Sequence, residues 1–176
     1  MAVQPIDATG PPVPFEDIGA CPFEGCVYRE WIANTQVSVR AERRAESPVV
    51  FTLDKGDRVQ AITGIVITTK PGRVRFRKAV DLTSATSRIH VEPWQTLYLL
   101  TYHGEGITTA WFNGRLYENV DGSEFFNGLC DVRPGSCNGT VVEKPKKVWW
   151  VRVRNRTWQT GWTNETGKFD NKDRFG

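Results

Sequence analysis

The chain has 176 residues, of which 39% are hydrophobic, 11% aromatic and 24% charged, and its formal net charge is +3. This length allows one large domain or two small ones with a buried core, and the composition excludes a largely disordered chain. The small net charge is far from the strongly basic balance of a dedicated nucleic-acid-binding protein, and no apolar run of about 18 residues is present to span a membrane as a helix.

Residues 1–20 contain four Pro and two Gly without apolar periodicity, which predicts an extended leader or linker. The sequence has no basic start followed by an apolar stretch, so it carries no secretory signal as written. If the protein is exported, we therefore expect that a signal segment has been removed ahead of residue 1.

Apolar and polar residues then alternate with period two in several short segments, which predicts half-buried strands. In the first half of the chain these segments are 27–33, 37–43, 49–53, 58–63, 64–70 and 73–78. The polar stretch 83–88 has no apolar face, so we expect a domain boundary near it.

In the second half, strands are predicted at 96–102, 106–112, 114–120, 148–155 and 157–164, with a Gly-rich excursion over 121–147. Helical turns are expected only at 123–129 and 168–175, so the helix content should be below about 10%. No segment has room for a crossover helix, which excludes a parallel sheet. The sequence thus predicts an all-β protein made of small barrels or sandwiches with little helix.

Two segments resemble the bacterial SH3-like (SH3b) domain family. Residues 37–64, "VSVRAERRAESPVVFTLDKGDRVQAITG", are similar to its opening half, and residues 149–164, "WWVRVRNRTWQTGWTN", are similar to its closing half. These segments are too distant in sequence for one compact barrel, and residues 106–117 between them have a similar layout. The resemblance therefore implies two SH3-like barrels in tandem, at 21–83 and at 84–176, the second with an inserted loop at 121–147.

Four cysteines form two local pairs, Cys21 with Cys26 and Cys130 with Cys137. Neither spacing fits a structural zinc site well, and neither is the C-x-x-C of a redox motif. Each pair brackets a turn, which favours two short disulfides over a shared zinc site or free buried thiols. Disulfides would imply a periplasmic or extracellular location.

Catalytic patterns are weak. A Cys/His hydrolase needs a thiolate activated by an imidazole, and the chain offers only His90 and His103 for that role. With the cysteines bridged no nucleophile would be left, so the sequence predicts no catalytic residue, no metal site and no cofactor. The hydrolase is a lesser alternative that requires a free, activated cysteine.

The closing segment has the pattern of a binding surface. Alternation places Val151 and Val153 on one face of a strand together with Trp149, and Arg152 on the other face. Six Lys or Arg stand against one Glu over 143–156, which favours an extended, partly anionic ligand held in a groove of aromatic side chains. The expected ligand-binding residues are Trp150, Trp158, Trp162, Arg152 and Arg154, with Tyr98 and Tyr102 as lesser candidates.

Two alternative roles for these aromatic residues stay open. They can belong to the core or to edge-strand packing, as most aromatic side chains of small barrels do. They can also form a nucleic-acid-binding surface, although the modest charge argues against one. The leading hypothesis is a non-catalytic, exported binding or scaffolding module, whose partner would be a cell-wall peptide or another envelope protein.

Overall fold

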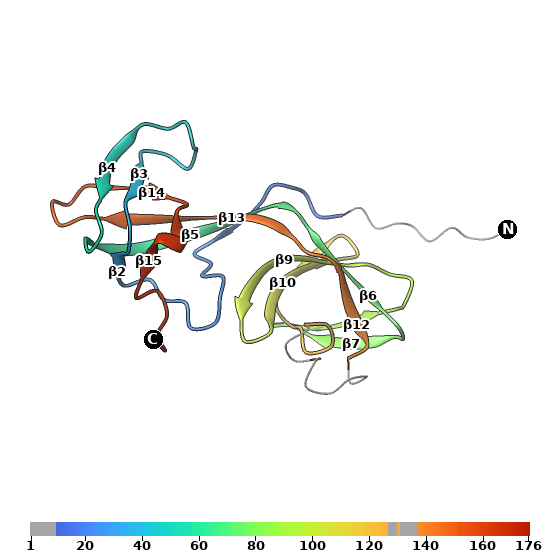
Figure 1. The fold of residues 1–176 in the computed structure, drawn as a ribbon. Coiled ribbons are helices and arrows are strands. Elements are labelled where there is room, and N and C mark those ends of the chain that lie inside the picture. The colour runs from blue at the N-terminus through green and yellow to red at the C-terminus, as the bar shows by residue number, and fades with distance from the viewer. Residues whose placement is uncertain (1–9, 127–129, 131–136) are drawn as a thin grey trace. The chain divides into compact units, whose positions relative to one another are not determined.

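The computed structural model describes residues 10–126, 130 and 137–176, and its regular secondary structure is almost entirely antiparallel strand (Figure 1). Strands make up 54% of it, and in the described residues helical structure is limited to the 3-10 turn η1, Thr166–Lys168, and to Cys130. The sheets are curled. The all-β prediction is confirmed.

The chain divides into two compact units. Unit one comprises Met1–Phe15 and Thr68–Lys146, and unit two comprises Glu16–Ile67 and Lys147–Gly176. This division differs from the expected tandem order of 21–83 followed by 84–176, because unit one is inserted into the sequence of unit two. The chain leaves unit two within β5 (Arg58–Lys70) and returns to it at the start of β13 (Lys146–Arg154).

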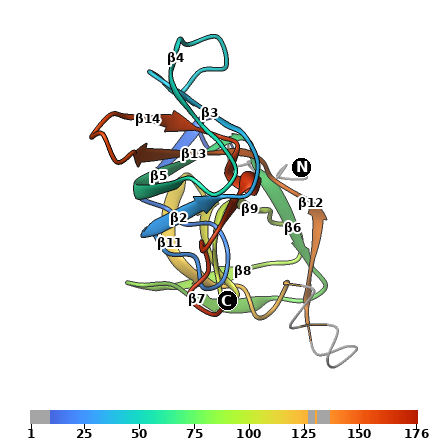
Figure 2. The ribbon, with the colours of Figure 1, turned by 60° about the vertical axis from the view of Figure 1, so that its left-hand side comes forward.

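The main sheet of unit two has the strand order β15-β2-β5-β13-β14-β3-β4, with β1 paired to β5. Its remaining strands are β1 (Phe15–Ile18), β2 (Glu30–Ala33), β3 (Val37–Arg40), β4 (Val49–Leu53), β14 (Thr160–Thr163) and β15 (Phe169–Asp170). Figure 2 shows the β13–β14 hairpin, and β14 pairs with β3 through Trp162 and Arg40.

The segments 37–64 and 149–164 therefore meet in one sheet, although their distance in sequence argued against it. The physical reason is that β5 and β13 are neighbouring strands, so the insertion begins and ends at adjacent points. Closing a longer connection adds only slowly to the entropic cost, and an inserted segment that folds by itself adds less still.

The core of unit two is made of inward side chains from most of its strands. They are Trp31, Ala33, Val37, Val39, Leu53, Val59, Ala61, Val151, Val153 and Phe169. Val151 and Val153 are fully buried, as the alternation predicted. Gly64 lies inside the continuous β5, where a Cβ would come within 2.6 Å of Trp149 Nε1, so a larger residue would displace the Tyr28–Trp149 pair.

Unit one has a five-stranded sheet of order β11-β10-β9-β6-β12 and the separate hairpin β7-β8. The strands are β6 (Gly72–Phe76), β7 (Val80–Thr83), β8 (Arg88–Val91), β9 (Leu97–Gly104), β10 (Ile107–Phe112), β11 (Arg115–Asp121) and β12 (Gly139–Glu143). They enclose a core of their own, which includes Val74, Leu97 and Phe125.

Three sequence predictions differ from this arrangement. The polar stretch 83–88 is the turn of the β7–β8 hairpin, where Ser84 Oγ donates to the Ser87 carbonyl, so it lies inside unit one. The excursion expected at 121–147 contains strand β12. The expected leader contains β1, which pairs with β5, while residues 1–9 lie outside the described residues.

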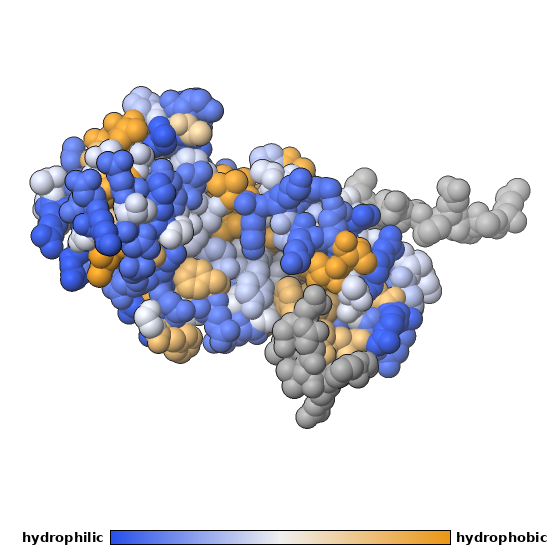
Figure 3. All heavy atoms as spheres, in the orientation of Figure 1, coloured by the Kyte–Doolittle hydropathy of each residue, from blue (hydrophilic) through white to orange (hydrophobic). Residues whose placement is uncertain are grey.

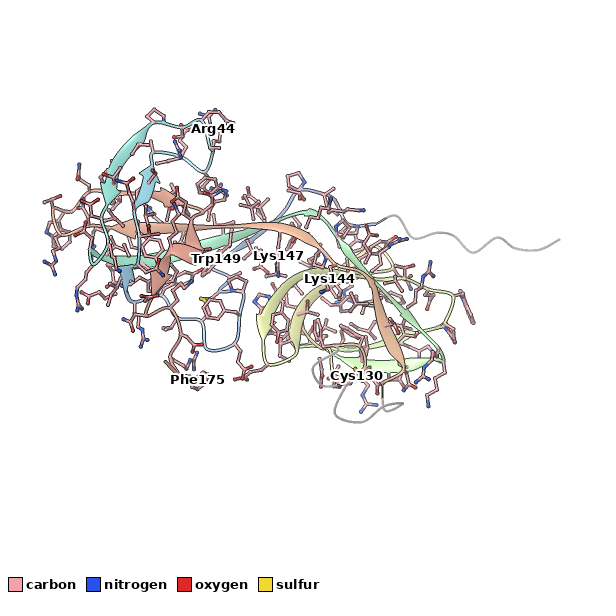
Figure 4. All side chains as sticks on the ribbon, viewed as in Figure 1. Arg44, Cys130, Lys144, Lys147, Trp149 and Phe175 are labelled. Atoms are coloured by element: carbon pink, nitrogen blue, oxygen red, sulfur yellow. A yellow bond between two sulfur atoms is a disulfide. The ribbon has the colours of Figure 1, made fainter. Side chains whose placement is uncertain are left out.

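Each unit contains one disulfide. Cys21 is bonded to Cys26 in unit two and Cys130 to Cys137 in unit one, with Cα–Cα distances of 5.5 and 5.4 Å (Cys130 is labelled in Figure 4). Both predicted pairings are confirmed, and they account for all four cysteines of the sequence. Such bridges are typical of an oxidising, extracytoplasmic environment.

In the described part of the chain, no helix is long and apolar enough to cross a membrane.

Candidate functional site

The β13–β14 hairpin of unit two turns through residues 155–159, and Asn155 fixes this turn. Its Oδ1 accepts hydrogen bonds from the backbone N–H groups of Thr157 (3.1 Å) and Gln159 (2.9 Å). Its Nδ2 donates to Gln159 Oε1 at 2.8 Å, and the Trp158 N–H donates to the Asn155 carbonyl at 3.1 Å. The turn therefore holds the residue at its tip in one backbone conformation.

That residue is Trp158, which has a φ of 67° and a side chain that is 74% exposed. The left-handed conformation costs an ordinary L-residue about 1–2 kcal/mol, and glycine or asparagine is favoured at such hairpin positions. Tryptophan lacks the backbone freedom of glycine at this position, and its ring is not buried. Stability of the fold therefore does not explain its presence.

Two arginines stack on exposed or half-exposed tryptophan rings. The guanidinium carbon of Arg154 lies 4.4 Å from the centre of the Trp158 ring, and that of Arg43 lies 5.6 Å from the Trp162 ring. Exposed contacts of this kind contribute about 0.5–1 kcal/mol each. They help to hold the two rings in place.

The strand register brings further arginines onto the same face of the sheet. Val153 faces Gly161 on the inner side, whereas Arg152 is directly opposite Trp162, which is in turn opposite Arg40. We call this outer face the arginine–tryptophan surface: Arg40, Arg43, Arg152, Arg154, Trp158 and Trp162. Hydrophilic residues dominate the visible surface of unit two in Figure 3.

The arginines of this surface differ in how far they are already satisfied. Arg40 Nη1 donates to the Ser47 carbonyl at 2.8 Å, and Arg43 pairs with Glu16 at 3.1 Å. Within the described residues, Arg152 has neither a hydrogen-bond partner nor an ion-pair partner. Arg44, at the tip of the β3–β4 loop in Figure 4, is neutralised by Glu42 at 2.6 Å and stays outside the surface.

Trp150 was expected at this surface, but it is only 5% exposed. The face opposite the valines is covered at this point of β13, although it is open two residues further on, at Arg152. A buried ring cannot be a surface anchor, so Trp150 does not belong to the candidate site.

Trp149 lies on the core side, as predicted. It is labelled in Figure 4 and meets Trp31 edge to face with ring centres 5.7 Å apart. Its Nε1 donates to the Tyr28 hydroxyl at 3.0 Å. Burial raises the pKa of Tyr28 to about 12, so this hydroxyl stays protonated throughout the neutral range.

Tyr98 and Tyr102 both lie on β9, in unit one. The Tyr102 hydroxyl accepts a hydrogen bond from the Gly106 N–H at 3.2 Å, and its ring meets Phe126 edge to face with centres 5.1 Å apart. Tyr98 is half-buried, opposite Arg73 and Trp111 in the sheet of that unit. Of the seven predicted residues, the structure thus brings together Trp158, Trp162, Arg152 and Arg154 in one hairpin.

Both histidines of the sequence have structural partners in unit one. His90 Nδ1 lies 2.8 Å from Asp81 and Nε2 lies 3.2 Å from Glu92; hydrogen bonds to these carboxylates, Asp81 first, raise the pKa of His90. His103 Nε2 lies 2.8 Å from Thr109 Oγ1. All four cysteines are paired in the two disulfides. The described residues contain no group of three or more His, Cys, Asp or Glu side chains placed to hold a metal ion.

Sequence reasoning missed Arg40 and Arg43. The V-x-V-R pattern of β3 carried the signal for Arg40, which must point away from Val37 and Val39, but its neighbour Trp162 comes from a distant segment.

The chain matches no protein-family model, no curated protein and no solved structure.

Proposed function

We propose that unit two is a binding module whose arginine–tryptophan surface holds an extended, partly anionic ligand such as a cell-wall peptide. The observation that carries the proposal is Trp158, which is exposed on a rigid turn in an unfavourable backbone conformation with Arg154 stacked on its ring. Backbone strain of this kind is concentrated at functional sites, and Trp and Arg are the side chains most enriched at binding hot spots.

The meeting of 37–64 and 149–164 in one unit supports a further proposal, that unit two is a single SH3-like barrel. Small barrels of this type bind extended peptides along aromatic-lined surfaces between their loops. The β3–β4 loop supplies Arg43 and the β13–β14 hairpin supplies Trp158, so two loops contribute to the surface.

The charge of the surface favours carboxylates as the ligand groups. Four arginines contribute to it, Arg43 is matched by Glu16, and Arg152 has no partner within the described residues. A guanidinium group binds a carboxylate through two parallel hydrogen bonds, which gives both energy and direction.

The module acts without catalysis, in the periplasm or outside the cell, as a binding or scaffolding component of the envelope. The two disulfides support that location, because they form and persist in oxidising compartments.

The test is co-sedimentation of the protein with purified peptidoglycan. Trp158→Gly removes the ring and relieves the backbone, so we expect binding to fall at least tenfold while the thermal midpoint is retained. Trp94→Ala is the matched control, because Trp94 is also exposed, at 63%, but lies in unit one. Equal binding by wild type and the Trp158 variant would contradict the proposal.

Single-stranded nucleic acid is the second candidate ligand. The exposed ring of Trp158 with Arg154 beside it is also a platform on which a base can stack. We expect only weak, non-specific affinity, which falls steeply with salt because each neutralised phosphate releases a counterion. A sub-micromolar Kd for an oligothymidylate at physiological salt, measured by fluorescence anisotropy, would place this candidate first.

A further inference from the structure

Unit two has a pocket of about 200 Å³ where the β4–β5 turn meets the β13–β14 turn. It is lined by Thr52, Leu53, Gly56, Asp57, Arg58, Asn155, Arg156 and Thr157. Sites for small molecules usually measure about 300–1,000 Å³, so this pocket has room for one small group and not for a chain passing through.

The charged groups of the pocket differ in what they already bind. Asp57 Oδ2 accepts the Asp54 N–H at 2.8 Å, which commits this carboxylate to the turn. Arg58 Nη1 donates to Glu30 Oε1, which leaves the other donors of Arg58 available. Within the described residues, Arg156 has no hydrogen-bond or ion-pair partner. The donors left over in the pocket are therefore those of two guanidinium groups, which suit a carboxylate.

Both walls of the pocket are fixed before any ligand arrives. In the β4–β5 turn, the Gly56 N–H donates to the Ala33 carbonyl at 2.7 Å and the Asp57 N–H to the Asp54 carbonyl at 3.0 Å. On the opposite wall, Asn155 holds its own turn through its bonds to Thr157 and Gln159. A preorganised pocket binds without the entropic cost of ordering its loops.

The pocket and the proposed anchor share one turn, because the lining residue Thr157 is followed directly in sequence by Trp158. We infer that it receives the terminal carboxylate of the bound peptide, so that the module recognises a free chain end while the preceding residues lie across Trp158. This inference rests on the proposed function and adds to it the class of ligand: peptides that end in a carboxylate.

The experiment compares two octapeptides of alternating Glu and Ala, one ending in a carboxylate and one in an amide, by isothermal titration. We expect wild type to bind the acid at least tenfold more tightly than the amide. Arg156→Gln should abolish this preference without weakening the amide complex. Arg174→Gln, an exposed arginine of unit two outside the pocket, is the control that should keep it.

Equal affinity of the acid and the amide for wild type overturns the inference and leaves the proposed function standing. Failure of both peptides to bind counts against the proposed function and the inference together. Competition by inorganic phosphate as effective as that of the acid peptide would identify a general anion pocket and would also overturn the assignment to a chain end.

Discussion

Both units close a β-hairpin with residues of positive φ, and they use opposite kinds of side chain to do so. In unit one, β10 and β11 are joined by Asn113 and Gly114, with φ of 48° and 76°. Asn-Gly is the sequence that such a two-residue turn favours. In unit two, Trp158 occupies its positive-φ position although glycine would be favoured there. The first hairpin is optimised for folding, whereas the second retains a strained aromatic residue at the surface.

The largest loss of stability should come from substitutions in the two hydrophobic cores, one in each unit. Trp31 is fully buried in unit two and Phe125 is fully buried in unit one. Replacing either by alanine should cost about 3–5 kcal/mol, because a large ring is lost from a packed interior. Hydrogen exchange should show the greatest loss of protection in the unit that carries the change. Equal losses in both units would mean that they unfold as one body.

The disulfides provide the next comparison, because each unit has one and their loops are of similar length. The paired cysteines are 5 positions apart in the sequence in unit two and 7 positions apart in unit one. The chain-entropy model assigns about 2 kcal/mol to such short loops. Replacing either pair by serine should therefore lower the free energy of unfolding by nearly the same amount in denaturant titrations. A much larger loss from one pair would reveal a packing role for its loop.

Single substitutions in the two hairpin turns should change stability less. Gly114→Ala should cost about 1 kcal/mol, because the added Cβ has space around it but the positive φ is unfavourable. Trp158→Gly should leave stability within about 0.5 kcal/mol of wild type, because relief of strain offsets the lost stacking and the greater flexibility of glycine. Denaturant midpoints measure both. A loss of several kcal/mol in the Trp158 variant would assign its ring to folding.

The smallest expected effect on stability is the pH-dependent contribution of His90, in unit one. Because Asp81 and Glu92 raise its pKa in the folded state, its contribution to stability is present at acidic pH, below the unfolded-state value. This contribution is lost as the pH rises through the folded-state pKa. The pKa of His90 can be measured by NMR titration, and Asp81→Asn should lower it. An unchanged titration in this variant would show that the hydrogen bond is absent in solution.

Local alternation identified most strands, because side chains alternate between core and solvent along a strand. It placed Val151 and Val153 correctly. It missed five strands of 2 to 5 residues, which are too short for a clear alternation: β1, β7, β8, β12 and β15. It also misplaced Trp150, since the burial of an outward residue depends on which other segments cover its strand.

The candidate site shows the same limit. The tryptophans and arginines of the β13–β14 hairpin could be predicted, because they lie within one short stretch of sequence. The position of Arg40 and Arg43 beside Trp162 could not be predicted, because it depends on β14 lying next to β3. The pocket could not be predicted for the same reason, since the two turns that line it belong to segments on either side of the insertion.

The insertion of unit one into unit two also sets the order in which the chain can fold as it is synthesised or threaded through a membrane. All strands of unit one precede residue 147 and can pair as soon as they emerge. The strands β2 to β5 must wait for β13 and β14, which β5 and β3 need as partners. During that interval their apolar faces are uncovered, which makes the unfinished sheet the aggregation-prone stage of biogenesis. The arginine–tryptophan surface, which draws on strands from both sides of the insertion, is therefore among the last parts of the molecule to form.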